Sequence, residues 1–468
     1  MNALRYILFI IPLFFALVIS SCISDDITDS PSATLEFSTD TVSFGTIFTD
    51  LSTPTARLQV FNRNKKGVII SHIGFKDPST PFTLNVDGVS GKIFNDVEIR
   101  GNDSIYIFME CYINSDEAYD PQRVADQLEF VTNGVRQEVE VEAWAWNVTR
   151  LKGLAVEKDM ILTAERPYVI FDTLRVEPEA TLTIEPGAWL LFHDKAMMEV
   201  KGTLLALGET GNEIRMSGDR LDDILPDVAY DQLAGQWGGI DISPESFGNR
   251  LEFVNMRSTV SGLRVDSCGD LSKNKLTLVN SWLHNSQGSA FSSQYSWVDA
   301  YGCCFSEAAG SVVSLTGGRH NFVQCTIANS YLFSSLFLPN LYLKHCLPEE
   351  SDENSQPLME ASFENGIVWG EIGAPIYPGD LVGSNVFMRY MLFKANGSDD
   401  ENFIECIWNE DPMYYTVRDD YYFNYRLQPD SPALGRGNAA YLTPECLYDM
   451  DGLYRLADGP PALGAYAD

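Results

Sequence analysis

Residues 276–324 read LTLVNSWLHNSQGSAFSSQYSWVDAYGCCFSEAAGSVVSLTGGRHNFVQ, and one short pattern recurs within them and just before them. Its four copies are Phe253-Val254-Asn255, Leu278-Val279-Asn280, Ala300-Tyr301-Gly302 and Phe322-Val323-Gln324. The third residues of the copies step by 25, 22 and 22 positions. A period near 22 with several short strands per repeat is typical of coils that bury their inner face by stacking on one another. We therefore predict a parallel β-helix.

Two other residue types repeat at this interval. Gly262, Gly288 and Gly310 step by 26 and 22 positions, and Cys303, Cys325 and Cys346 step by 22 and 21. The cysteine spacing predicts a ladder of buried thiols between coils. Leucine-rich repeats share the period, but their leucine consensus is missing here. No Cys-x-x-Cys pair is present, which argues against a metal knuckle.

The segments that flank this repeat resemble a known group of proteins. LRVEPEATLTIEPGAWLLF (174–192) and VKGTLLALG (200–208) resemble the first coils of Bacteroidetes right-handed parallel β-helix repeat lipoproteins. DSPALG (430–435) and YDMDGLYRLADGPPALGAYAD (448–468) resemble their closing segment. The resemblance covers residues 150–468 and implies a pectate-lyase-like superfold, with the β-helix over 148–427 and the closing segment over 428–468. It names a fold and not a reaction, because this architecture carries lyases, hydrolases and proteins of no known activity.

The preceding segment, 33–147, has a different texture. Polar and apolar residues alternate over 56–62, 105–113 and 139–143, as in strands with one buried face. Turn signals such as Asp87-Gly88 and Asn133-Gly134 separate the strands. These features predict a β-sandwich. Its motifs Val42-Ser43-Phe44-Gly45-Thr46-Ile47, Val60-Phe61-Asn62 and Thr132-Asn133 resemble those of immunoglobulin-like modules of the ASH/Hydin type. We interpret this domain as a spacer or docking module. Since a β-sandwich and a β-helix both consist of strands, the chain is predicted to be all-β.

The N-terminus predicts a membrane anchor. Residues 1–21 contain one arginine and an apolar run, as in a lipoprotein signal peptide, and Ile19-Ser20-Ser21-Cys22 resembles the bacterial lipobox. Acylation of Cys22 would tether the chain to the membrane. The acidic tether at 22–32 resembles the surface-export signal of Bacteroidetes lipoproteins. We therefore expect an outer-membrane protein that faces the cell exterior; the alternative is anchorage that faces the periplasm.

Composition narrows the possible partners. The chain has 468 residues, with 32 Lys and Arg against 65 Asp and Glu, so its formal net charge is −33. Such an acidic protein repels phosphate backbones, which argues against nucleic-acid binding. The chain has only five histidines, which argues against a zinc site.

One insertion between predicted coils, 217–237, is rich in polar and aromatic residues. Tyr230 or Trp237 could stack on a sugar while carboxylates bind its hydroxyl groups. No cofactor is expected; the one alternative is Ca²⁺, which dense oxygen ligands could hold, although the spacing is not that of an EF-hand. The alternative is a structural insertion in which Asp219 pairs with Arg220 and Trp237 packs at a coil corner. The candidate ligand-binding residues are Asp219, Arg220, Asp222, Asp223, Asp227, Tyr230, Asp231 and Trp237.

A second aromatic and acidic stretch, 411–425, suits either carbohydrate contact or a cap over the open end of the β-helix. The Gly-His-Gly and Arg-Ile-Lys motifs of polygalacturonase-like hydrolases are absent, so no catalytic residue is assigned. We expect a non-catalytic, membrane-anchored envelope lipoprotein that binds a glycan or an envelope protein. The alternatives are a polysaccharide lyase or glycoside hydrolase of unrecognised type, and a purely structural envelope protein.

Overall fold

A computed structural model describes residues 26–116, 118–225, 228–344, 358–372, 376–377, 385–416 and 423–467. The chain divides into two compact units, Met1–Trp146 and Asn147–Asp468, and each has its own hydrophobic core. The predicted signal peptide, Cys22, Asp227 and Cys346 lie outside the described residues. No helix among the described residues is long and apolar enough to cross a bilayer.

The first unit consists of two sheets that enclose one core. Strands pair antiparallel throughout except where β2 runs parallel to β11. The predicted alternation over 56–62 is confirmed, because Leu58 and Val60 are buried while Arg57 is exposed. One sheet has the order β1 (Glu36–Phe37), β3 (Ala56–Asn62), β9 (Asp103–Cys111), β5 (Phe82–Val86) and β6 (Val89–Gly91). The other has the order β2 (Thr41–Phe48), β11 (Val135–Trp146), β10 (Gln122–Thr132), β4 (Val68–Phe75) and β7 (Ile93–Phe94), with β8 (Val97–Ile99) also on β4.

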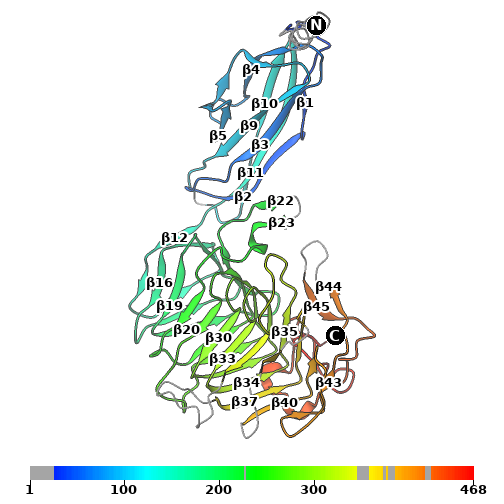
Figure 1. Cartoon of the computed structure of the whole chain (residues 1–468). Coiled ribbons are helices and arrows are strands. Elements are labelled where there is room, and N and C mark those ends of the chain that lie inside the picture. The colour runs from blue at the N-terminus through cyan, green and yellow to red at the C-terminus, as the bar shows by residue number, and fades with distance from the viewer. Residues whose placement is uncertain are drawn as a thin grey trace, which may run out of the picture. The chain divides into compact units, whose positions relative to one another are not determined.

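The second unit contains three long parallel sheets, so the chain adopts a β-helix-like fold (Figure 1). Successive strands enter the three sheets in turn. Sheet I consists of β12 (Thr149–Lys152), β15 (Tyr168–Phe171), β18 (Trp189–Phe192), β21 (Ile214–Gly218), β26 (Val254–Thr259), β29 (Trp282–Ser286), β32 (Cys304–Ala308), β35 (Thr326–Asn329), β38 (Ile367–Gly370), β41 (Leu392–Phe393) and β43 (Ile407–Trp408).

Sheets II and III follow the same logic. Sheet II consists of β13 (Ala155–Val156), β16 (Thr173–Val176), β19 (Met197–Val200), β24 (Ile240–Ile242), β27 (Leu263–Val265), β30 (Phe291–Gln294), β33 (Val313–Thr316), β36 (Leu341–Lys344) and β39 (Ile376–Tyr377). Sheet III consists of β14 (Met160–Leu162), β17 (Thr181–Ile184), β20 (Thr203–Leu207), β25 (Asn249–Glu252), β28 (Leu276–Val279), β31 (Trp297–Tyr301), β34 (Gly318–Val323), β37 (Leu358–Glu364), β40 (Val386–Arg389) and β42 (Phe403–Ile404).

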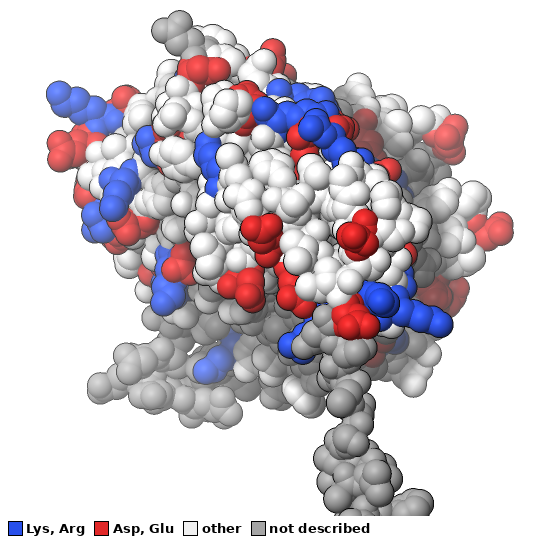
Figure 2. Space-filling view, turned by 90° about the horizontal axis from the view of Figure 1, so that it is seen from above, with Lys and Arg blue, Asp and Glu red and all other residues white. Residues whose placement is uncertain are grey.

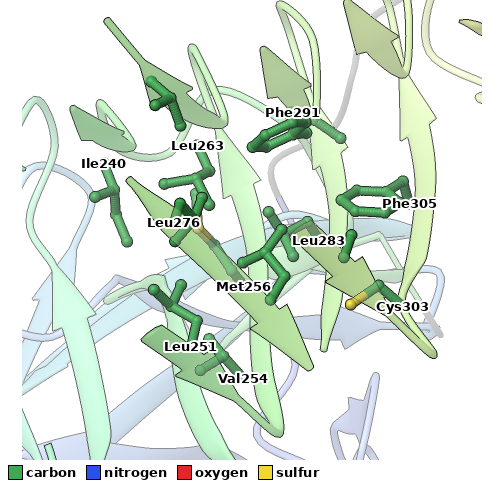
Figure 3. Packing of buried hydrophobic residues seen from close by; sticks show 14 of the residues in the cluster. Ile240, Leu251, Val254, Met256, Leu263, Leu276, Leu283, Phe291, Cys303 and Phe305 are labelled. Carbon is green, nitrogen blue, oxygen red and sulfur yellow. The ribbon is translucent and has the colours of Figure 1, made fainter. Parts of the chain in front are cut away.

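Side chains from all three sheets meet inside the coil (Figure 3). Phe291 comes from sheet II, Leu276 from sheet III, and Leu283 and Phe305 from sheet I, and each is at most 1% exposed. Aromatic rings stack from coil to coil, with centroids 5.1 Å apart between Phe322 and Phe363, which pair on neighbouring strands of sheet III. Stacking therefore buries the inner face, as the 22-residue period predicts.

The sequence repeat is in register for three of its four copies. Leu278 pairs with Ala300 and Ala300 with Phe322, so Asn280 and Gln324 follow equivalent strands. The remaining copy, Phe253-Val254-Asn255, lies two residues out of register with the other three. Leu251 pairs with Leu278, so the position equivalent to Asn280 is Phe253, which takes the same left-handed turn at φ +46°.

Two members of the predicted glycine repeat, and two of the predicted cysteine repeat, occupy equivalent positions on adjacent coils. The Gly310 amide donates to the Gly288 carbonyl, but the Gly288 amide donates to Val260, so the predicted Gly262 is out of register. Cys304 pairs with Thr326, which sets the neighbouring Cys303 and Cys325 on adjacent coils. The cysteines in the described residues are free thiols, and six of these seven are buried.

The last part of the chain lies against the side of the coil. It contains the hairpin of β44 (Tyr414–Thr416) and β45 (Asn424–Leu427) and two single-turn 3-10 helices, Ala439–Tyr441 and Pro444–Cys446. Tyr414 and Tyr425 pack on Cys304 and Ile367, which face outward from sheet I. The predicted end cap is therefore wrong for these residues, because sheet I presents an apolar outer face that they cover. Both faces of this part of sheet I are thus buried, as is usual for parallel sheets.

Charged side chains of both signs lie close together over the face shown in Figure 2, with uncharged surface between them. In the first unit, ion pairs also join neighbouring strands. Arg123, for example, lies 2.5 Å from Glu140 and 2.7 Å from Glu142.

Candidate functional site

Four side chains form one row on the outer face of sheet I. Trp189 pairs with Arg215, Arg215 with Asn255, and Asn255 with Trp282. Side chains of a strand alternate between its faces, and the intervening Leu190, Met216, Met256 and Leu283 all belong to the core. The row, called here the outer row, therefore faces away from the core. Three strand spacings separate its two tryptophans, which is about 14 Å.

The same row becomes apolar further along the sheet. Trp282 pairs with Cys304, and the row continues through Thr326, Ile367, Leu392 and Ile407. The C-terminal part of the chain covers these residues and shares a hydrophobic cluster with them. The part of the row that the C-terminal residues cover ends beside Trp282. The change from apolar to polar residues in one row thus decides where sheet I is open.

A cleft of about 400 Å³ lies over the open part of the row. All four outer-row residues line it, together with Glu213 and Arg257 on the same face of the coil. The insertion after β21 contributes Asp231. The C-terminal part of the chain contributes Phe423, Arg426, Met450, Asp451 and Tyr466. The cleft therefore has aromatic and charged walls from three separate segments.

Ion pairs fix two of the three arginines in the cleft. Arg257 lies 3.0 Å from Asp231, and Arg426 makes two hydrogen bonds of 2.6 Å to Asp451. Arg215 differs, because it is exposed and forms no ion pair with any described residue. Its guanidinium carbon lies 6.0 Å from the ring centroid of Trp189. Arg215 can thus bind a ligand without first breaking an ion pair.

Trp282 is held in a fixed orientation. Its Nε1 donates to Ser306 Oγ over 3.2 Å, and its ring stacks on His284 with centroids 4.3 Å apart and planes 12° apart. Burial, followed by the charge of Arg257, lowers the pKa of His284 well below its usual value. The imidazole under Trp282 is therefore neutral at physiological pH. A half-buried ring fixed in this way is a preorganised platform for a ligand.

The residues predicted from the insertion are dispersed. Asp219 bonds to His193 over 2.6 Å, and not to Arg220. Arg220 instead binds Asp222 through two hydrogen bonds and covers the Tyr230 ring at 4.0 Å. Tyr230 thus has one face occupied by its own chain.

The other predicted residues also separate. Asp223 is exposed on the short β22 (Asp223–Leu225), which pairs with β23 (Val228–Ala229) ahead of a 3-10 turn at Tyr230–Gln232. Trp237 is fully buried, stacks on Phe192 at 4.0 Å and donates to the Arg257 carbonyl over 2.7 Å. It belongs to the core, so it offers no ring face to a sugar. Of the seven predicted residues that the structure describes, Asp231 is the one that lines the cleft.

Sequence reasoning missed the outer row itself. Its signal is nonetheless present, because tryptophan or arginine alternates with core residues in β18, β21 and β29. Recognising the row requires the register between coils, and the misaligned copy at Phe253 lies in this part of the repeat. Among the described residues, no group of three or more His, Cys, Asp or Glu side chains is placed to hold a metal ion.

Comparisons with known proteins give only distant likenesses. No protein-family model matches the chain, and no curated protein matches its sequence. A family 123 glycoside hydrolase from Clostridium perfringens aligns with a TM-score of 0.18 and 8% identity, over 24% of this chain and 26% of the hydrolase. A protein of unknown function from Porphyromonas gingivalis W83 aligns with a TM-score of 0.19 and 11% identity, over 26% of this chain and 59% of that protein. Neither likeness is strong enough to support an argument about activity.

Proposed function

We propose that this protein is a lipid-anchored envelope protein that binds an oligosaccharide in the cleft and does not alter it chemically. The outer row supports the proposal, because Trp189 and Trp282 stand on either side of Arg215 and Asn255 on one sheet. Indole faces stack on the apolar faces of sugar rings, while guanidinium and amide groups bind sugar hydroxyls. A separation of about 14 Å between the tryptophans exceeds one sugar ring, so the ligand is a chain of several rings.

The rest of the chain fits a protein displayed on the cell surface. The lipobox at Cys22 and the acidic tether support anchorage in the outer membrane, facing outward. We further propose that the first unit is an immunoglobulin-like spacer, since its two sheets enclose one core. Replacing Cys22 by Ser should move the protein from the membrane fraction to the soluble fraction. Persistence in the membrane fraction would contradict acylation.

A glycan-degrading enzyme is the second candidate. Glu213 and Asp231 both line the cleft, and most glycoside hydrolases use a pair of carboxyl groups as catalytic residues. Asp231 is, however, held 3.0 Å from Arg257 in an ion pair, which favours a structural role for it. Release of new reducing ends from a bound glycan would establish this second candidate and refute the first.

The deciding experiment is a glycan array probed with the full chain in detergent, followed by titration of the best oligosaccharide. Trp189→Ala, Trp282→Ala and Arg215→Gln should each weaken binding about tenfold or more, a factor worth about 1.4 kcal/mol. Trp297→Ala is the matched control, because Trp297 is half-buried on β31 of sheet III and does not line the cleft. Binding that survives all three cleft variants, or no binding to any glycan, would overturn the proposal.

A further inference from the structure

A second cavity lies on the outer face of sheet I. It has a volume of about 560 Å³ and lies between the later strands of the sheet and the β44–β45 hairpin. Trp369 of β38 and Lys394 after β41 line it from the sheet side. Glu371, Asp411 and Gln428 add further polar groups. Among the described residues, it shares no lining residue with the cleft.

The two openings lie in neighbouring positions of the same sheet. A row parallel to the outer row runs from Arg257 through His284, Ser306 and Ala328 to Trp369. Four strand spacings separate Arg257 from Trp369, which is about 19 Å. The three residues between them are at most 8% exposed. The covered stretch therefore divides the face into two separate openings.

The walls of the second cavity are firmly held. Tyr414 and Tyr425 meet edge to face with centroids 4.9 Å apart, and Gln428 Nε2 donates to the Tyr414 carbonyl over 2.9 Å. Lys394 Nζ donates to the Gly370 carbonyl over 2.5 Å and lies 5.6 Å from the ring centroid of Trp369. These contacts form a shaped recess with one half-buried indole and several fixed polar groups beside it.

We propose that this second cavity binds a neutral sugar, independently of the cleft. The Trp369 indole provides the stacking surface, and Lys394, Gln428 and the two carboxylates provide donors and acceptors for hydroxyl groups. The charges favour a neutral sugar over a sugar acid, because the cavity lining holds two carboxylates, Glu371 and Asp411, against one lysine. The β44–β45 hairpin forms one wall of the cavity through Tyr414 and Tyr425.

Saturation-transfer NMR on the full chain in detergent tests this proposal, with the methyl glycosides of glucose, galactose, mannose and N-acetylglucosamine as probes. At least one glycoside should give a signal that Trp369→Ala abolishes and Lys394→Gln reduces. Trp282→Ala and the control Trp297→Ala should retain it. If Trp369→Ala does not fold, Trp369→Phe and Lys394→Gln decide the matter, and an unchanged signal in both refutes the site.

The outcomes separate this inference from the proposed function. A signal lost in Trp282→Ala but kept in Trp369→Ala would place the sugar in the cleft, which overturns the second site and supports the first. Silence of all four glycosides, with oligosaccharide binding intact on the array, would likewise overturn the second site alone.

Discussion

The Tyr425 hydroxyl donates a hydrogen bond to the buried carboxyl group of Glu307, which joins the β44–β45 hairpin to strand β32 of the coil. The backbone amide of Ser330 donates to the same oxygen, Oε1, over 3.2 Å. Oε2 of Glu307 is buried and has no hydrogen-bond partner among the described residues. Burial raises the pKa of Glu307 from 4.5 to about 7, although the Tyr425 bond opposes that rise. The hairpin therefore rests on a carboxyl group that is protonated in mildly acidic solution.

This arrangement predicts that acid stabilises the second unit. A raised carboxyl pKa means that the folded protein holds the proton more tightly than the unfolded chain does. The contribution is fully present below pH 4.5 and is lost as the pH rises through about 7. Its size is about 3 kcal/mol, since each pKa unit corresponds to about 1.4 kcal/mol. Chemical denaturation at pH 5 and pH 8 measures the difference.

Glu307→Gln is the control for this prediction. The amide is neutral at both pH values and keeps an acceptor oxygen for Tyr425. It should flatten the difference between pH 5 and pH 8, and the variant should be the more stable protein at pH 8. An equally large pH dependence in Glu307→Gln would show that other carboxyl groups cause it.

Substitutions of two tryptophans should distinguish a residue that stabilises the fold from a residue that binds the glycan. Trp237 is fully buried against Phe192, so Trp237→Ala leaves a core cavity and should cost about 3–5 kcal/mol of unfolding free energy. Trp282 is only half-buried, so Trp282→Ala should lower glycan affinity at a smaller cost in stability. Thermal unfolding and a glycan titration on both variants check this. Equal losses of stability would contradict the assignment of Trp282 to the site.

The coil could be predicted from sequence because its period is enforced by burial. Leu278, Ala300 and Phe322 must all face the core, and a slip of one residue would expose them. The cleft could not be predicted in the same way. Its floor joins residues from four different coils. Its far wall comes from residues between Phe423 and Tyr466, more than 160 positions after β26 ends at Thr259. The local composition instead indicated a binding site in the insertion, because charged residues are dense there. In the structure these charged residues form ion pairs.

The insertion offers a test of which aspartates matter. Asp231 lines the cleft and pairs with Arg257, so Asp231→Ala frees an arginine on the cleft wall and should alter glycan affinity. Asp222 pairs with Arg220 outside the cleft, so Asp222→Ala should leave affinity unchanged. The Asp222 change should also cost no more than about 1 kcal/mol of stability, as is usual for partly exposed ion pairs. Titration of the same glycan with both variants compares them, and a loss of affinity in Asp222→Ala would refute this assignment.

The far wall of the cleft depends on Arg455, which is 3% exposed. Its guanidinium donates to Gln324 Oε1 on the coil over 3.2 Å and to the carbonyls of Gly464 and Ala465 over 3.2 and 2.6 Å. Arg455→Met leaves these acceptors buried without a donor, so it should cost about 3 kcal/mol or more of unfolding free energy. Since Met450 and Tyr466 lie on either side in the chain and line the cleft, glycan affinity should fall as well.

Arg436→Met is the matched control for Arg455→Met, because Arg436 is an exposed arginine of the same C-terminal stretch. It should change stability by no more than about 0.5 kcal/mol and leave binding intact. Limited proteolysis adds a local readout, since the loss of Arg455 should expose the segment that follows the hairpin while the coil stays resistant. If Arg455→Met lowered stability but left glycan affinity at the level of Arg436→Met, the C-terminal wall would be dispensable for binding and the outer row alone would form the site.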